Sequence, residues 1–206
     1  MNLFNKPAPY RLIVRPDDVA REKAGLLNQR IARTFLLKME EDLAISLAEF
    51  TATMEEFSIM SNWLLKSFRD VEAFPMVINN LSGIAPSQIH LRVQYSGWIG
   101  LLRHRLNRLS EVMESYQLPG LKQPGKWQMP IVTAVPPNQY STIMLHLSKT
   151  EIQLETLVKS IVVERRDAEY GCWQPVQRIS LAGLEMGIPM SLNSCMKQET
   201  SHLYFW

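Results

Sequence analysis

Residues 140–151, YSTIMLHLSKTE, alternate apolar and polar side chains with a period of two and then reach a helix start. The aliphatic positions of this stretch share one face of the expected strand: Ile143, Leu145 and Leu147. The opposite face carries Thr142, Met144 and His146. Ser148, followed three residues later by Glu151, is typical of a capping box. The pattern predicts a β-ribbon that leads into a helix, as in a ribbon-helix-helix DNA-binding unit. A half-exposed sheet edge is the alternative for the face with Thr142, because any antiparallel strand shows such alternation.

The segment YRLIVR near the N-terminus has the same organisation. Tyr10, Leu12 and Val14 would share one strand face, and the other face carries Arg11, Ile13 and Arg15. Pro16, Asp17 and Asp18 then favour a helix start, because proline and acidic residues suit the first turn. Arginine at alternating positions suits guanine edges or phosphates, whereas a solvated sheet edge protected by charge is the alternative.

Most other apolar positions follow the three-four spacing of amphipathic helices. We expect one long helix, or two with a tight break, within residues 26–74, and another helix from Trp98 to Gln117. Further helices are expected from the Ser148 cap to Arg166 and from Pro175 to Gly187. Short extended segments are expected at HLRVQY and MPIVTAV.

Prolines and glycines divide the chain once clearly, at residues 119–129. We expect a mainly helical region with an N-terminal strand at 1–118, a linker at 119–129, and a strand-helix-helix region with an aromatic C-terminal tail at 130–206. The fold class expected is α+β, mostly helical, with a ribbon-helix-helix-like element and additional long helices. The aromatic tail HLYFW is expected to dock on the protein or on a partner.

Composition limits the possible chemistry of the 206-residue chain. A net charge of +2 is only mildly basic, so any contact with nucleic acid must come from local clusters of cations. Two cysteines and four scattered histidines predict neither a zinc site nor a disulfide framework, and no cofactor is expected. No stretch has the length and character of a signal peptide or a membrane span, so we expect a cytoplasmic protein.

One further basic cluster lies on the expected helix 98–117: Arg103, His104, Arg105 and Arg108. A solvated helix face is the simpler interpretation, because Glu111 and Glu114 lie within helical pairing distance. The alternative is a patch that contacts phosphates and adds affinity without reading sequence.

Enzymatic motifs are missing from the sequence. The chain contains no GxSxG, P-loop, GxGxxG or HExxH pattern, and its acidic clusters fall on helix faces expected to be exposed. We therefore expect no enzymatic activity.

The run PIVTAVPPNQYSTIMLHLSKTEIQLETLVKSIVVERR and the early segment YRLIVRPDDVAREKAGL resemble the AcaB-like transcriptional regulators of conjugative plasmids and integrating conjugative elements. The resemblance covers mainly residues 10–27 and 130–166. The chain lacks the acidic-aromatic motif that is found in the middle of many of these regulators. The resemblance implies a homodimeric activator of conjugation genes with a ribbon-helix-helix-like element.

The sequence therefore predicts a homodimeric regulator that places a β-ribbon in the major groove of double-stranded DNA and has neither a membrane nor a small-molecule partner. The expected DNA-binding residues are Arg11, Ile13, Arg15, Thr142, Met144, His146, Lys149, Arg103, Arg105 and Arg108. The alternative function is a non-enzymatic adaptor of a conjugation or secretion assembly, which would use the 26–74 helix and the aromatic tail as docking surfaces.

Overall fold

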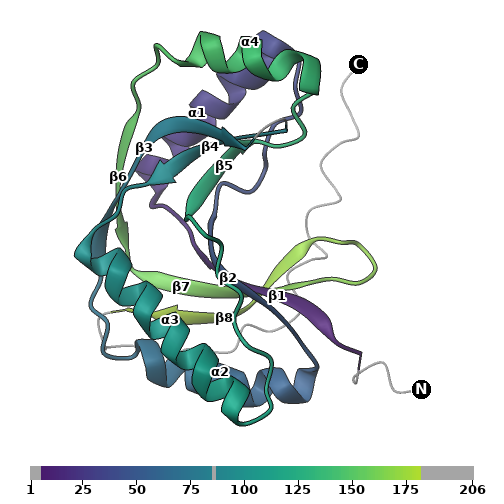
Figure 1. Cartoon of the computed structure of the whole chain (residues 1–206), viewed down its shortest axis with the longest axis vertical. Helices are drawn as coiled ribbons and strands as arrows, with labels where there is room; N and C mark the ends of the chain where they lie inside the picture. The colour runs from purple at the N-terminus through teal and green to yellow at the C-terminus, as the bar shows by residue number, and fades with distance from the viewer. Residues whose placement is uncertain (1–5, 85–86, 182–206) are drawn as a thin grey trace, which may run out of the picture.

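The computed structural model describes residues 6–84 and 87–181. The strands in this part of the chain form two four-stranded antiparallel sheets. The first sheet has the strand order β2-β1-β7-β8 and the second has the order β5-β4-β3-β6 (Figure 1). The elements in chain order are β1 (Ala8–Val14), α1 (Asp18–Phe35), β2 (Ile45–Ala52), α2 (Met54–Phe68), β3 (Phe74–Ile84), β4 (Gln88–Val93), α3 (Gly97–Ser115), β5 (Gln128–Val132), α4 (Pro137–Leu147), β6 (Gln153–Val158), β7 (Ser160–Arg166) and β8 (Trp173–Ser180).

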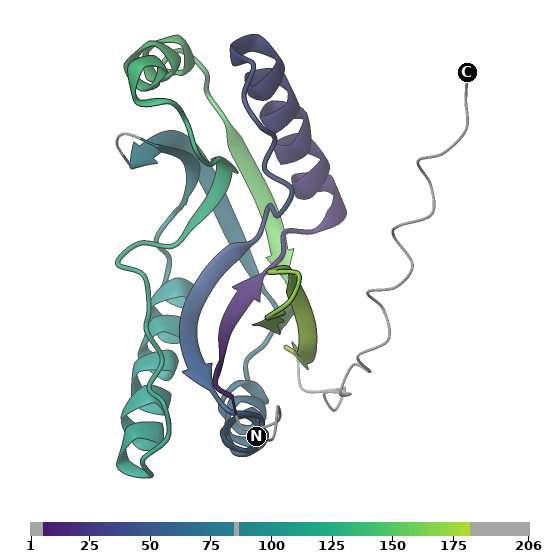
Figure 2. The same ribbon diagram turned by 90° about the vertical axis from the view of Figure 1, so that its right-hand side faces the viewer.

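Each sheet packs one apolar face against helices and leaves a more polar face uncovered by them. Tyr10 and Leu12 of β1 and Val163 of β7 are buried on the helix side of the first sheet, where α2 packs on β2 and β8. Met76 and Leu91 belong to the corresponding face of the second sheet, which α1 and α4 cover. Figure 2 shows α1 with α4 at one end of the molecule and α2 with α3 at the other. The polar faces are therefore free to form a site between the sheets.

The chain repeats a β-α-β-α order, first as β1-α1-β2-α2 and then as β4-α3-β5-α4. In each repeat the two strands pair with each other, but the helix between them packs beside the other repeat's sheet or helix. Thus α1 lies beside β5 and β6, and α3 lies beside α2. A direct hydrogen bond from Trp127 Nε1, just before β5, to the Leu47 carbonyl of β2 measures 3.1 Å. The two halves are interlocked through these contacts.

The helix start predicted at Asp17 and Asp18 is confirmed, and Asp17 is the N-cap of α1. One carboxylate oxygen accepts a hydrogen bond from the Ala20 amide at 2.9 Å, and the other accepts one from the Leu157 amide of β6 at 3.2 Å. These bonds hold the pKa of the Asp17 carboxyl below its usual value, and the bond from the Ala20 amide has the largest effect. The cap therefore fixes the start of α1 to the second sheet.

Other local predictions are confirmed where helix or strand period is unambiguous. Helix α3 matches the helix expected from Trp98, and its apolar stripe is buried at Leu102, Leu106 and Leu109. Strands β1, β4 and β5 match the segments YRLIVR, HLRVQY and MPIVTAV to within a few residues.

The long helix expected within residues 26–74 is wrong. Helix α1 ends at Phe35, where Leu36 adopts a left-handed conformation with φ 54°, and β2 separates it from α2. Thr53 starts α2 with a capping box in which its side chain and that of Glu56 exchange hydrogen bonds with each other's backbone amides. The apolar residues within 26–74 follow a three-four spacing, but a short strand can also contain such spacing. Pairing with β1 makes residues 45–52 a strand.

The ribbon expected at residues 140–147 is also wrong, because this stretch is helix α4. Ile143 and Leu147, four residues apart, are buried on one helix face, whereas Leu145 is 74% exposed. Ser148 is the C-cap of α4 and does not start a helix. The expected helices that follow are replaced by β6 and β7, and by β8 up to Ser180. The ribbon that would have joined two protomers into a DNA-binding homodimer is therefore absent from this stretch.

These findings correct the fold class. The protein is an α+β fold of two antiparallel sheets with helices outside them, and it is not a mostly helical ribbon-helix-helix protein. Strand β5, at the end of the 119–129 stretch, pairs with β4 from before it. The division into regions at this stretch stays a prediction, and the aromatic tail lies outside the described residues. Within residues 6–84 and 87–181, no helix has the length and apolar character to cross a membrane.

Candidate ligand-binding cleft

A cleft of about 550 Å³ opens at the polar faces of the two sheets. Strand β2 contributes Ser46 and Glu49 from one side, and β5 contributes Gln128 and Pro130 from the other. The loop before β5 closes one edge. The residues that line the cleft include Arg11, Glu40, Asp42, Ala44, Ser46, Glu49, Lys122, Lys126, Gln128 and Pro130.

A ring of four charged side chains forms the first-sheet part of the site. Glu164 of β7 is 1% exposed and accepts hydrogen bonds from Arg11 Nη2 at 2.6 Å and Arg15 Nη2 at 2.5 Å. Asp42 completes the ring by accepting from Arg15 Nη1 at 2.8 Å and from Arg11. The Arg11 guanidinium also lies 4.3 Å from the ring centre of Trp173. Two cations and two carboxylates thus neutralise one another.

Three other polar groups of the cleft, on Ser46, Lys122 and Lys126, have no such partners in the described chain. The Ser46 hydroxyl oxygen is buried and has no hydrogen-bond partner among the described residues. Lys122 and Lys126 are exposed, and neither ammonium forms an ion pair within residues 6–84 and 87–181. Because a buried hydroxyl without a partner costs free energy, a ligand that bonds to Ser46 would recover it. These three donors suit an anionic group, and the carboxylates of Glu40 and Glu49 line the cleft beside them.

Helix α3 holds the loop that carries the two lysines. Arg103 donates to the carbonyl of Gly125 at 3.1 Å, and its guanidinium lies 4.8 Å from the ring centre of Trp127. Gln123 donates to Asn107 at 2.6 Å. The backbone of Lys122 pairs with that of Glu49 on β2 through two hydrogen bonds, 2.8 and 2.9 Å. The lysine ammonium groups therefore extend from an anchored backbone.

His90 is buried beside the cleft, on β4. It pairs with Pro130 of β5, so its side chain lies on the sheet face that carries Pro130 and Gln128. The residue is 5% exposed, and its Nδ1 atom is buried without a partner in the described chain. Burial, followed by the charges of Arg92 and Lys126, lowers the pKa of His90 below its usual value. The imidazole is therefore held in its neutral form near pH 7.

Besides its lysines, the acid–base groups that line the cleft in the described chain are carboxylates. Among the described residues that line it there is neither histidine nor cysteine, and the carboxylates are Glu40, Asp42 and Glu49. Glu40 accepts a hydrogen bond from Thr133 Oγ1 at 2.7 Å, and Asp42 belongs to the charged ring. No cluster of three or more potential metal ligands occurs in the part of the chain that the structure describes.

The residues expected to bind DNA do not form one surface. Arg11 and Arg15 are in the charged ring, Ile13 is fully buried, and the cluster of Arg103, Arg105 and Arg108 lies on α3. The residues of the expected second ribbon, Thr142, Met144 and His146, are on α4, and Lys149 is in the turn after it. Of this set only Arg11 lines the cleft.

Sequence reasoning missed Ser46, Lys122 and Lys126. The alternation of LAISLAEF, which places Ser46 among buried residues, was the available signal, but it was absorbed into the expected long helix. Lys122 and Lys126 lie in the stretch 119–129, which the sequence predicts to be a linker.

Comparison with known proteins identifies solved structures that share the fold of this chain. No protein-family model and no curated protein sequence matches the chain. Among solved structures, E. coli LigT with NADP+ is 14% identical, with a TM-score of 0.61 over 85% of this chain and 99% of LigT. A structure described as a phosphoesterase has the same values. The protein TT0787 of Thermus thermophilus is 19% identical, with a TM-score of 0.61 over 86% of this chain and all of that one. The chain thus has a LigT-like fold.

This likeness corrects the functional expectations. The fold is that of LigT and a phosphoesterase, and not that of an AcaB-like regulator, so the resemblance to those regulators is wrong. The DNA-binding activator and the adaptor lose their structural basis. Missing motifs were also no ground for excluding an enzyme, since a structure described as a phosphoesterase shares this fold. The expectation of no small-molecule partner is likewise overturned, because E. coli LigT has been crystallised with NADP+, 3'-AMP and ATP.

Proposed function

We propose that the protein binds a nucleotide or a related phosphate ester in the cleft between its sheets. The observation that carries the proposal is the pairing pattern of the site. Ser46 presents a buried hydroxyl without a partner, and Lys122 and Lys126 present two ammonium groups without counter-ions in the described chain. Phosphate oxygens accept hydrogen bonds and carry the charge that these donors lack.

The size of the site and the nature of the fold neighbours support this ligand class. A cleft of about 550 Å³ is within the range of small-molecule sites. The E. coli LigT structures that share the fold hold NADP+, 3'-AMP and ATP, all of which contain phosphate esters. The charged ring leaves Arg11 neutralised, so selectivity for the anion falls mainly on the two lysines.

Calorimetric titration of the full chain with 3'-AMP, ATP, NADP+ and adenosine tests the proposal. At least one phosphate-bearing compound should bind, and adenosine should bind at least about tenfold more weakly because it offers no charge to the lysines. The double variant Lys122→Gln/Lys126→Gln should lose most of this affinity. Lys23→Gln/Lys159→Gln, which removes two exposed lysines outside the cleft, is the matched control.

Absence of binding by all three phosphate compounds at millimolar concentration would refute the proposal. Equal affinity of the two double variants would place the ligand elsewhere.

Cleavage of the bound phosphoester is a second candidate function, favoured by the phosphoesterase among the fold neighbours. Glu40 and Glu49 are the proton carriers of the cleft outside the charged ring, and the lysines would stabilise charge on the phosphoryl group. Release of phosphate or of a nucleoside product from the bound compound should then fall at least about a hundredfold in the Glu40→Gln/Glu49→Gln variant, within the usual range for lost acid–base catalysis. Binding without product release, by the unaltered protein, would leave only the first function.

We also propose that the protein works in the cytoplasm, since its two-cysteine composition is typical of a reducing compartment. Fractionation of cells that contain it would test this location.

A further inference from the structure

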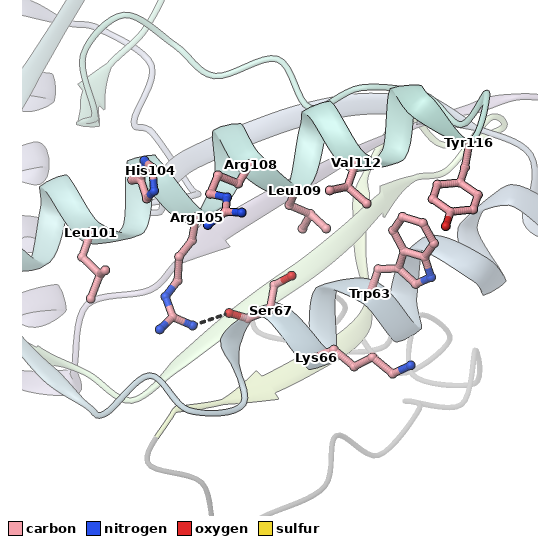
Figure 3. Close-up of a pocket in the computed structure, with 10 residues that line it drawn as sticks. All are labelled: Trp63, Lys66, Ser67, Leu101, His104, Arg105, Arg108, Leu109, Val112 and Tyr116. Carbon is pink, nitrogen blue, oxygen red and sulfur yellow. Dashed lines mark hydrogen bonds between the residues drawn. The ribbon is translucent and has the colours of Figure 1, made fainter.

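A second hollow, the α2/α3 groove, lies between the two helices that cover the first sheet. It measures about 720 Å³ and shares no lining residue with the cleft. Figure 3 shows the side chains that line it. Its wall on α2 consists of Trp63, Lys66 and Ser67. Its wall on α3 and the residue after it consists of Leu101, His104, Arg105, Arg108, Leu109, Val112 and Tyr116. The groove therefore needs an explanation separate from that of the cleft.

The floor and one end of the groove are apolar. Leu101 is 38% exposed, Val112 is 44% exposed and Tyr116 is 67% exposed, although all three belong to or follow one packed helix. Trp63 meets Tyr116 edge to face, with ring centroids 4.8 Å apart. Exposed apolar side chains that gather along one groove mark an interaction surface more often than scattered ones do.

The rest of the rim is cationic. Lys66, Arg105 and Arg108 line the groove with His104, and its lining contains no carboxylate. Asp70, just outside, neutralises Arg105 through hydrogen bonds of 2.6 and 3.0 Å, and Arg105 also donates to the Ser67 carbonyl. Lys66 and Arg108 form no ion pair within the described residues. Two positive charges thus flank an apolar floor without compensation.

We propose that the α2/α3 groove binds an acidic amphipathic helix of a partner protein, with aliphatic side chains on the groove floor and carboxylates beside Lys66 and Arg108. Two helices, and no strand edge, bound the groove, so the geometry suits a third helix with anchors at three-four spacing. Leu101 and Tyr116 are separated by about 22 Å along the α3 axis, which corresponds to about four turns of a bound helix.

Charge and surface chemistry disfavour the other occupants. A second copy related by a twofold axis would bring the same cations together. Nucleic acid bases would find no stacking partner in Leu101, Leu109 and Val112, and the Tyr116 ring already packs against Trp63. Residues 182–206 of this chain contain only two glutamates and one lysine, which offer little charge to the rim.

Fluorescence anisotropy with the full chain tests the proposal. The probe is a labelled helical peptide of about 18 residues of Leu, Ala and Glu, with Leu at three-four spacing, and the comparison peptide has Lys at every Glu position. The acidic peptide should bind at least about tenfold more tightly than the basic one, and this preference should shrink as salt is added.

Two variant pairs locate the binding. Lys66→Glu/Arg108→Glu should weaken binding of the acidic peptide at least about tenfold, whereas Lys23→Glu/Arg33→Glu on α1 should change it less than about twofold. Val112→Asp should weaken binding too, and Val19→Asp, at another exposed helical valine, should not. The second pair keeps the test decisive if the charge reversals disturb folding, which circular dichroism would reveal.

Several outcomes would overturn the proposal. One is equal affinity for the two peptides, and another is binding that ignores both Lys66→Glu/Arg108→Glu and Val112→Asp. Tighter binding of a single-stranded RNA of similar length would identify a nucleic-acid surface. Self-association abolished by Val112→Asp would identify a second copy as the occupant. A large gain in peptide affinity on changing Leu203, Tyr204 and Phe205 to Ser would identify the chain's own C-terminal segment.

Discussion

Arg11 and His90 occupy equivalent places in the two halves of the molecule, yet their surroundings are opposite. Each lies on an inner strand, on the cleft side of its sheet, seven residues before the first residue of the following helix. Arg11 is held by Asp42, Glu164 and Trp173. The Nδ1 atom of His90 is buried without a partner in the described chain, with two cations nearby. The charges around Arg11 are electrostatically complete, whereas the surroundings of His90 can still gain from a ligand.

The largest effect should come from breaking the charged ring around Arg11. Glu164→Gln leaves Arg11, whose side chain is 14% exposed, with Asp42 as its remaining carboxylate in the described chain, and removing one partner of a buried ion pair costs up to about 3–5 kcal/mol. Urea unfolding should show a loss of this size, whereas Glu155→Gln on the exposed side of β6 should stay within about 0.5 kcal/mol. A loss below about 1 kcal/mol for Glu164→Gln would show that the ring is not a stabilising element.

His90 should make the stability of the protein depend on pH. Its pKa is lowered in the folded state, so below pH 6.5 the unfolded chain binds more protons at this site. The free energy of unfolding should therefore fall as the pH drops from 6.5 toward the folded-state pKa. In His90→Gln this fall should be smaller. The same fall in His90→Gln as in the unaltered protein would contradict the assignment, and His104→Gln, at an exposed histidine, is the control.

The smallest effect on stability concerns Ser46. Replacing it with Ala removes a buried hydroxyl that has no partner in the described chain, so stability should be unchanged or rise by up to about 1 kcal/mol. Affinity for the phosphate ligand should fall in the same variant, because the lost hydroxyl is one of the unpaired donors that the proposed ligand would use. Thermal unfolding and calorimetric titration of Ser46→Ala measure the two effects. Joint loss of stability and affinity would show that Ser46 is a structural residue.

The spacing of apolar residues predicted helices and strands correctly only where it fitted one of the two, helix or strand, and not both. The stripe of α3 fits a helix alone and was predicted correctly, as was the start of α1 at Asp17. Leu154 and Val158 fit both helical spacing and alternation, and pairing of β6 with β3 decides for a strand. In α4 the alternation of Ile143, Leu145 and Leu147 hid the four-residue spacing that buries the first and last.

The site was less accessible to sequence reasoning than the elements. Glu164 meets Arg11 across a separation of 153 residues, and no local pattern contains that contact. Ser46, Lys122 and Pro130 come together only because β2 and β5 belong to different sheets that meet at the cleft. Arginines on a strand face were correctly placed on that face, but their partners, and therefore their role, depend on distant strands.

The exchange of α1 and α3 between the halves has a consequence for how the protein comes apart. Each β-α-β-α repeat packs one helix on its own sheet, α2 or α4, and places its other helix beside elements of the other half, α1 beside β5 and β6 and α3 beside α2. A fragment that contains one repeat would expose apolar surface that only the missing repeat covers, so neither half should be an independent folding unit. Loss of structure in one half should propagate at once to the other, and the two sheets should melt in a single cooperative transition.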